Sequence, residues 1–147
     1  MEDYFKLTGH IIFDLKDENG VLKDHREIKN VVVTAGKNYL ATWLAAASQA
    51  GAFMQYLALG TGTNAAVVGD TALQTELSTR VAGTITSSLA VWQNQGTFTA
   101  GVNTGAITEA GIFSASSSGT MLARQTFSVI NKGASDSLTI TWQITIS

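Results

Sequence analysis

The sequence predicts a mainly β domain: an antiparallel, jelly-roll-like β-sandwich with one α-helix near residues 35–50 and an N-terminal β-hairpin. Three observations lead to this fold class. Segments of alternating apolar and polar residues recur at intervals of about ten residues in the second half of the chain. Clusters rich in Gly, Asn and Ser separate these segments. The 147 residues include no cysteine, so a single domain, residues 1–147, must be held together by packing alone.

The N-terminal hairpin is predicted by two β-rich runs around an Asn-Gly pair. Residues 5–15 are rich in strand-forming types, Asn19-Gly20 suits a tight turn, and a second strand follows from Val21 to Val33. We expect this segment, residues 1–33, either to have one solvated face or to leave the body as an arm. Residues 34–147 then form the body.

One helix is predicted from apolar residues at helical spacing. Thr34 is a plausible N-cap and Gly51 a plausible end. The apolar positions between them are Tyr39, Leu40, Trp43 and Leu44. Such a stripe usually faces a core, so we interpret it as a packing seam and not as a cofactor site.

A buried strand is predicted over residues 54–59, ended by Gly60-Thr61-Gly62-Thr63. This glycine-rich turn lacks the Lys and following Ser or Thr that a phosphate-binding loop requires. After a long loop, residues 70–74 are predicted to start a short helix, because Thr71 and Gln74 are spaced as a capping box. Glu76 and Arg80 are four residues apart, which predicts a surface ion pair if the turn continues.

The remaining sequence predicts strands almost throughout. The last of them is the clearest, since the apolar residues alternate with neutral polar ones and form one predicted apolar face: Leu138, Ile140, Trp142, Ile144 and Ile146. The expected strands are residues 81–92, 96–100, 106–114, 120–129 and 138–146.

Charge is unevenly distributed along the chain. Residues 1–37 carry thirteen of the twenty charged side chains, and the net charge is -2. The other seven are Asp70, Glu76, Arg80, Glu109, Arg124, Lys132 and Asp136. A body so poor in charge suits contact with other protein, although a neutral monomer with Thr- and Ser-lined strands is the alternative. The sequence has no basic patch for nucleic acid, and no signal peptide or apolar run for a membrane, so we expect a soluble protein.

Few residues in the sequence are candidates for metal binding or for catalysis. His10 and His25 flank the predicted turn, and with Asp24 or Glu27 they could bind a metal ion. Two exposed histidines without a metal are the simpler interpretation. We therefore expect no metal and no cofactor. Glu109 stands alone in a neutral stretch and Arg124 lies in the next strand, which favours a structural ion pair over a general acid. The sequence therefore predicts a protein that is not an enzyme.

Several segments together resemble small virion structural proteins of tailed bacteriophages, a group that includes head-decoration and fibre-like components. The resemblance covers most of the chain in order, with segments 27–37, 57–63, 70–77, 107–113 and 121–142. It implies a self-assembling protein, by analogy a homotrimer, that is assembled in the host bacterial cytoplasm and resides in the virion. It transfers no functional site.

Two functions follow from this resemblance. The first is a capsid decoration or cement protein that bridges capsid subunits, with the major capsid protein or another virion protein as partner. The alternative is a collar, tail or fibre-base component that binds a host surface or attaches a fibre. In that case Trp92, Phe98 and Phe113 would form a carbohydrate platform, although their strand positions favour core packing.

Overall fold

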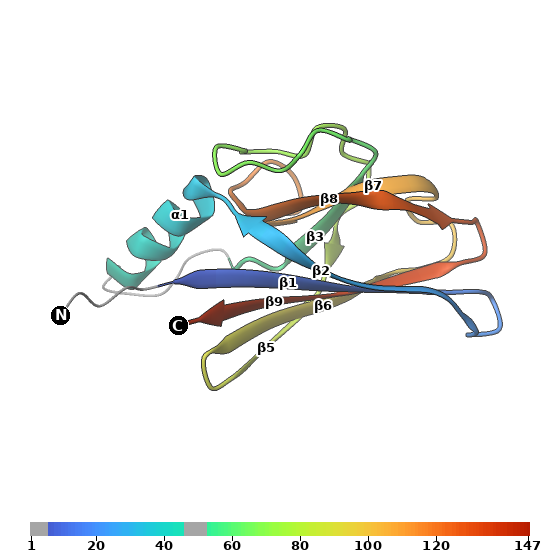
Figure 1. Cartoon of the computed structure of the whole chain (residues 1–147), viewed down its shortest axis with the longest axis horizontal. Coiled ribbons are helices and arrows are strands. Elements are labelled where there is room, and N and C mark those ends of the chain that lie inside the picture. The colour runs from blue at the N-terminus through green and yellow to red at the C-terminus, as the bar shows by residue number, and fades with distance from the viewer. Residues whose placement is uncertain (1–5, 46–52) are drawn as a thin grey trace.

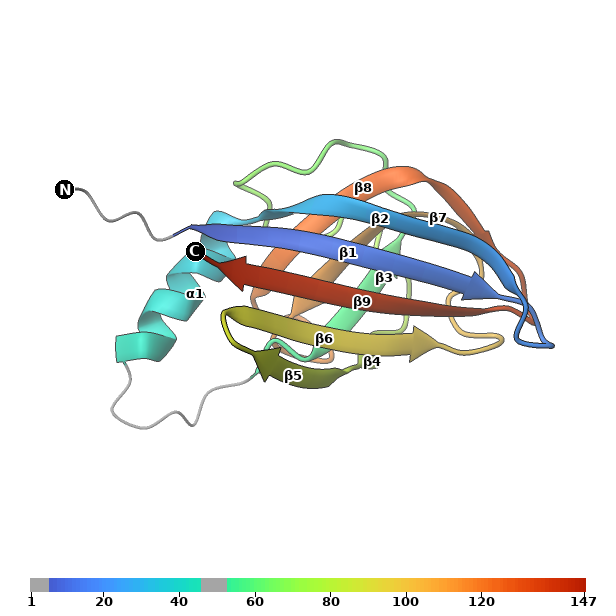
Figure 2. The ribbon, with the colours of Figure 1, turned by 60° about the horizontal axis from the view of Figure 1, so that its bottom comes forward.

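The computed structural model describes residues 6–45 and 53–147, which form a single nine-stranded antiparallel sheet and one helix. The sheet curls on itself into a nearly closed barrel (Figures 1 and 2). Its strands lie in the order β4-β3-β7-β8-β2-β1-β9-β6-β5. The elements are β1 (Leu7–Lys16), β2 (Leu22–Val32), α1 (Thr34–Ala45), β3 (Tyr56–Gly60), β4 (Val81–Ala82), β5 (Thr84–Ser88), β6 (Val91–Phe98), β7 (Gly105–Phe113), β8 (Met121–Lys132) and β9 (Ser137–Ile146).

The predicted mainly β class is confirmed, whereas a jelly-roll-like sandwich is not. A sandwich consists of two sheets that pack face to face without sharing hydrogen bonds at their centres. Here β2 pairs with β1 on one side and with β8 on the other, so the strands form one continuous sheet. The alternation of side chains is the same in both architectures, because each has one apolar face toward the core.

The N-terminal hairpin occupies the middle of the sheet and is not an arm that leaves the body. β1 pairs along its whole length with β9, from Leu7 opposite Ile146 to Lys16 opposite Ser137. The hairpin turn contains Gly20 with a positive φ of 78°, as the Asn-Gly pair predicts. The inward residues Ile11, Phe13 and Leu15 are buried in the main core.

The main core fills the barrel with side chains that alternate along the strands. From β9 it takes four of the five residues that were predicted to form the apolar face; these four are buried, whereas the fifth, Ile146, is 37% exposed at the end of the strand. The buried four are Leu138, Ile140, Trp142 and Ile144. On the outer face the same strand carries neutral polar groups that bond across to β6, such as Gln143 to Gln93 at 2.9 Å and Thr139 to Thr97 at 2.8 Å.

The junction between β2 and β8 is short, and an arginine bridges the strands where they separate. Only two residue pairs join them, Val31 with Arg124 and Val32 with Ala123. Further along, the Arg26 guanidinium donates hydrogen bonds to the backbone carbonyls of Ser128 and Val129 on β8. These bonds satisfy carbonyls that a longer ladder would otherwise have used.

The predicted strand over residues 81–92 is wrong, because the chain reverses inside it. β5 and β6 form a hairpin whose two turn residues are Leu89 and Ala90. Leu89 has a φ of +52°, a conformation that Gly, Asn or Asp normally supplies in such turns. A further residue, Gly83, separates the two-residue strand β4 from β5.

The long loop over residues 61–79 covers the outer face of β3, β7 and β8. Leu73 from this loop packs with Ala58, Phe113 and Met121 in a second apolar cluster. Residues 70–74 do not form the predicted short helix. Instead, the Gln74 side chain accepts hydrogen bonds from the Thr63 and Asn64 amides, both 2.9 Å, so it is used to fold the loop and not to cap a helix.

Helix α1 crosses one end of the barrel (Figures 1 and 2). It begins at Thr34, the residue predicted as its N-cap, and is described to Ala45; the predicted end at Gly51 lies outside the described residues. The helix contacts β8 closely at Gly36, where a Cβ atom would lie 2.5 Å from the Leu122 carbonyl oxygen. No helix in residues 6–45 or 53–147 has the length and hydropathy needed to span a membrane.

We predict that Gly36→Ala destabilises the protein although alanine is the better helix former. The added methyl group would meet the backbone of Leu122, which cannot move without disturbing the β8 ladder, and such overpacking costs about 1–3 kcal/mol. Gly69→Ala is the matched control, because no atom lies within 4 Å of its added Cβ. Urea denaturation of both variants measures the difference; equal midpoints would contradict the close helix contact.

Candidate functional site

An irregularity in the pairing of β7 with β8 places Glu109 away from the barrel interior. Two residue steps on β7, from Ile107 to Glu109, lie opposite four on β8, from Ile130 to Thr126. Ile107 and Ala110 both lie in the main core although they are three residues apart, so the side chains of β7 exchange faces at this irregularity. Glu109 therefore lies on the outer face, beneath the loop 61–79, with a fully buried side chain.

The Glu109 carboxylate holds this loop by accepting backbone hydrogen bonds. Oε1 accepts from the amides of Gly62 at 3.0 Å and Thr75 at 2.7 Å, and Oε2 accepts from the amide of Gln74 at 3.0 Å. Gly60 and Gly62 make room for it, since a Cβ at either position would lie within 2.6 Å of Oε1. The predicted turn after β3 is thus built around a carboxylate and not around a phosphate.

Arg124 completes this ion-pair centre, which consists of Glu109, Arg124 and Asp70. The guanidinium donates to Glu109 Oε2 from Nη2 at 2.8 Å and from Nε at 3.1 Å. It also donates from Nη1 to Asp70 Oδ2 at 2.8 Å and from Nη2 to the Asn64 carbonyl at 3.1 Å. The two residues proposed as a structural pair are therefore in contact, and they are joined by an aspartate from the loop.

Burial alone would raise the pKa of Glu109, because it disfavours the charged form. The hydrogen bonds from Thr75, Gln74, Arg124 and Gly62 outweigh burial and lower the pKa below its ordinary value. A general acid needs a raised pKa and an accessible proton. Both oxygens of Glu109 are used by donors of the protein itself, so the geometry is that of a structural carboxylate.

Glu76 and Arg80 also meet, but not on a helical turn and not fully at the surface. Arg80 Nε lies 2.5 Å from Glu76 Oε1, with 7% of the Arg80 side chain exposed. The same guanidinium donates to the carbonyls of Ala115 and Ser118 and lies 3.6 Å from the centre of the Phe113 ring. Arg80 thus fastens the end of the loop to the β7–β8 connection.

The two histidines do not face each other. His10 lies opposite Lys29, whereas His25 lies opposite Asp14, with His25 Nδ1 2.5 Å from Asp14 Oδ1. The hydrogen bond with Asp14 raises the pKa of His25. Among the described residues there is no group of three or more His, Cys, Asp or Glu side chains arranged to hold a metal ion.

The seven charged side chains of residues 38–147 are turned inward or paired. None of the six that form ion pairs is more than 27% exposed, and Lys132 is 2% exposed. Lys132 donates to the Thr99 carbonyl at 3.0 Å, and burial lowers its pKa. Asp136 accepts from Lys23 at 2.7 Å, and this bond, with that from the Gly133 amide, lowers the pKa of Asp136. The outer surface of the body is consequently almost uncharged.

Asn94, a fully buried amide inside the barrel, was not among the residues predicted from the sequence. Its Nδ2 donates to the carbonyls of Met54 at 3.0 Å and Gln55 at 2.9 Å, which joins the segment before β3 to β6. Gly83 approaches so closely that a Cβ there would collide with Asn94. No signal in the sequence indicates its burial, because Asn94 stands between Gln93 and Gln95 in a run of amides that is also common on exposed strands.

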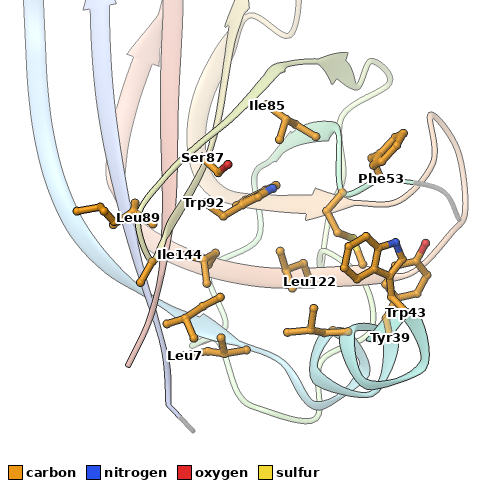
Figure 3. A pocket seen from close by; sticks show the side chains of 16 residues that line it. Leu7, Tyr39, Trp43, Phe53, Ile85, Ser87, Leu89, Trp92, Leu122 and Ile144 are labelled. Carbon is orange, nitrogen blue, oxygen red and sulfur yellow. The ribbon is translucent and has the colours of Figure 1, made fainter. Parts of the chain in front are cut away.

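An apolar cavity of about 340 Å³ lies between α1 and the β5–β6 hairpin (Figure 3). Tyr39, Leu40 and Trp43 of the predicted seam line it, whereas Leu44 is 65% exposed and does not face the core. Trp92 also lines the cavity. The other two aromatics of the carbohydrate-platform hypothesis, Phe98 and Phe113, are buried, so these three side chains form no exposed platform.

Comparison of the chain with models of protein families, with curated proteins and with solved structures gives no match.

We predict that Glu109→Gln destabilises the protein by about 3–5 kcal/mol, the usual cost of removing one partner of a buried ion pair. The amide removes the charge that Arg124 needs and places an NH₂ group against backbone donors. Glu76→Gln is the matched control and should cost less than about 1 kcal/mol, because 27% of that side chain is exposed. Urea unfolding measures both; similar losses would contradict the role of the centre.

Acid should weaken the fold through the same carboxylate. A group whose pKa is lower in the folded state stabilises it fully above the unfolded-state pKa, and this contribution is lost as the pH falls through the folded-state pKa. Glu109 and Asp136 both have lowered pKa values. We therefore expect the free energy of unfolding to fall between about pH 5 and pH 2, with a shallower fall in Glu109→Gln. If the free energy of unfolding fell equally steeply with pH in Glu109→Gln, the loss of stability in acid would come from other carboxylates.

Proposed function

We propose that this chain is a structural protein of a bacteriophage particle and that it decorates the capsid, where it bridges neighbouring capsid subunits. The observation that carries the proposal is the nearly uncharged outer surface of residues 53–147, whose charged side chains are engaged within the fold. Depletion of charge is characteristic of the buried centres of protein interfaces, because each charge there must be desolvated. The resemblance to small virion proteins suggests that the partners of this contact surface are the subunits of a phage particle.

The charged face of β1 and β2 supports an orientation for the bound protein. His25, Glu27 and Lys29 alternate along β2 on its exposed side, and β1 separates them from the neutral Thr and Gln side chains of β9 and β6. A surface that is charged over one hairpin and neutral elsewhere can bury its neutral part and keep the hairpin in water. We infer that the chain docks through its neutral faces, with the hairpin face toward solvent.

Attachment of a fibre through a collar or tail position is the second candidate. It shares the same neutral surface, but the buried positions of Phe98 and Phe113 remove the aromatic platform that favoured carbohydrate binding. Capsid decoration is therefore preferred over host-surface adhesion.

Particles assembled without this chain should lose infectivity severalfold faster on heating or in the presence of a chelator, because contacts that bridge subunits would be absent. The measurement is the surviving titre of particles with and without the chain, and addition of purified protein to the depleted particles is the control that should restore resistance. Unchanged heat resistance together with lost adsorption to cells would contradict decoration and support the collar or tail alternative.

A further inference from the structure

Leu89 is a fully exposed leucine at a strained backbone position. It is the first residue of the two-residue turn between β5 and β6, with 103% relative exposure and a φ of +52°. Glycine or asparagine would satisfy this conformation without strain and without exposing an apolar side chain. Within the single chain, Leu89 thus gains neither packing nor favourable backbone geometry.

The hairpin that carries Leu89 is fixed in place. The Ala90 carbonyl accepts a hydrogen bond from the Ile146 amide at 2.9 Å, and β6 pairs with β9 along its length. Leu89 is therefore held out from the end of the barrel on a firm support. A rigidly presented apolar side chain loses little conformational entropy when a partner covers it.

Next to Leu89 is a socket for such a side chain, the apolar cavity between α1 and the β5–β6 hairpin. Tyr39 and Trp43 from α1 lie on one side of it and Trp92 on another (Figure 3). The exposed side chains of Phe53 and Ile146 extend its apolar rim, and none of its lining residues is charged. Leu89 itself stands on the rim of this cavity with a fully exposed side chain, so within one chain neither the leucine nor the cavity is covered.

A third feature at the same place is the free edge of the sheet. β5 is the last strand in the order, and within the described residues its outer edge has no strand partner. Its residues, Thr84–Ser88, include neither the charged side chains nor the proline that proteins use to block edge pairing. An apolar projection, an apolar cavity and an unguarded edge therefore lie together on one end of the barrel.

We propose that this end binds a second copy of the same chain and that Leu89 of one copy enters the apolar cavity of the next. Projection and cavity belong to one surface, so two copies related by a twofold axis can exchange their leucines in a symmetric contact that closes as a dimer. A small-molecule ligand fits less well, because binding pockets usually carry several converging polar groups, and here the lining is almost wholly apolar. This inference does not depend on the proposed place in a virion.

The test is the mass of the purified full-length chain in solution, measured by light scattering and native mass spectrometry over a range of concentrations. The wild type should associate, and Leu89→Asp should weaken association by about tenfold or more, as loss of a central interface residue does. Val21→Asp is the matched control, because Val21 is 58% exposed beside the β1–β2 turn at the opposite end of the barrel (Figure 2). Circular dichroism should show the same fold in all three proteins.

A second variant tests whether Leu89 meets the cavity. Ser87→Asp places a carboxylate on the cavity wall at an exposed position and should also prevent self-association. Leu89→Asp also changes the rim of this cavity, so the two variants are measured separately. Unchanged association of Ser87→Asp would overturn the proposed pairing.

Three other outcomes would also overturn the proposal: a monomeric wild type, equal weakening by Val21→Asp, or tight binding of a fluorescent long-chain fatty acid by the monomer. The last arm is included because Lys6 and Lys37 line a neighbouring hollow with Leu40 and Leu44, a combination that suits an anionic amphiphile. All of these measurements use the isolated protein. If the isolated chain did not self-associate, the proposed role in capsid decoration would still be tested separately by the heat-resistance experiment.

Discussion

The buried carboxylate of Glu109 is the interaction on which one half of the molecule depends. Three backbone amides from the loop 61–79 and the guanidinium of Arg124 converge on it. Without this anion those donors would be buried and unsatisfied, which costs more than the bonds themselves are worth in water. The loop in turn contributes Leu73 to the second apolar cluster, so the cover over Phe113 and Met121 depends on the bonds that the carboxylate makes.

The small number of exposed charges on the body follows from the same arrangement. The charged groups after residue 37 tie loops and strand ends together, so most of the exposed charges among the described residues lie on the hairpin of β1 and β2 and at Lys6 and Lys37. Internal charges of this kind favour one loop conformation over others, because alternatives leave a charge unpaired. The inward position of the charged side chains thus both fixes the loop conformation and leaves the surface of the body nearly uncharged.

Local patterns in the sequence predicted the parts of the fold that local chemistry determines. The Asn19-Gly20 turn and the alternation of β9 were visible because each depends on residue types at neighbouring positions. The barrel was not visible, because alternation does not reveal which strands pair. The Leu89-Ala90 turn was missed since it contains none of the residues typical of turns. Glu109 and Arg124 were singled out as a pair, but the backbone amides they hold belong to a loop with no periodic pattern.

The pairing of β1 with β9 has a consequence for biosynthesis. The hairpin of β1 and β2 is complete soon after its residues leave the ribosome, yet β9, which covers its other edge, is made only after β3 to β8. During that interval Ile11, Phe13 and Leu15 form an uncovered apolar row beside an open strand edge, which is the kind of species that aggregates. The dense charge of the same hairpin acts as a gatekeeper against that aggregation. The charged residues thus protect the chain while it is being made.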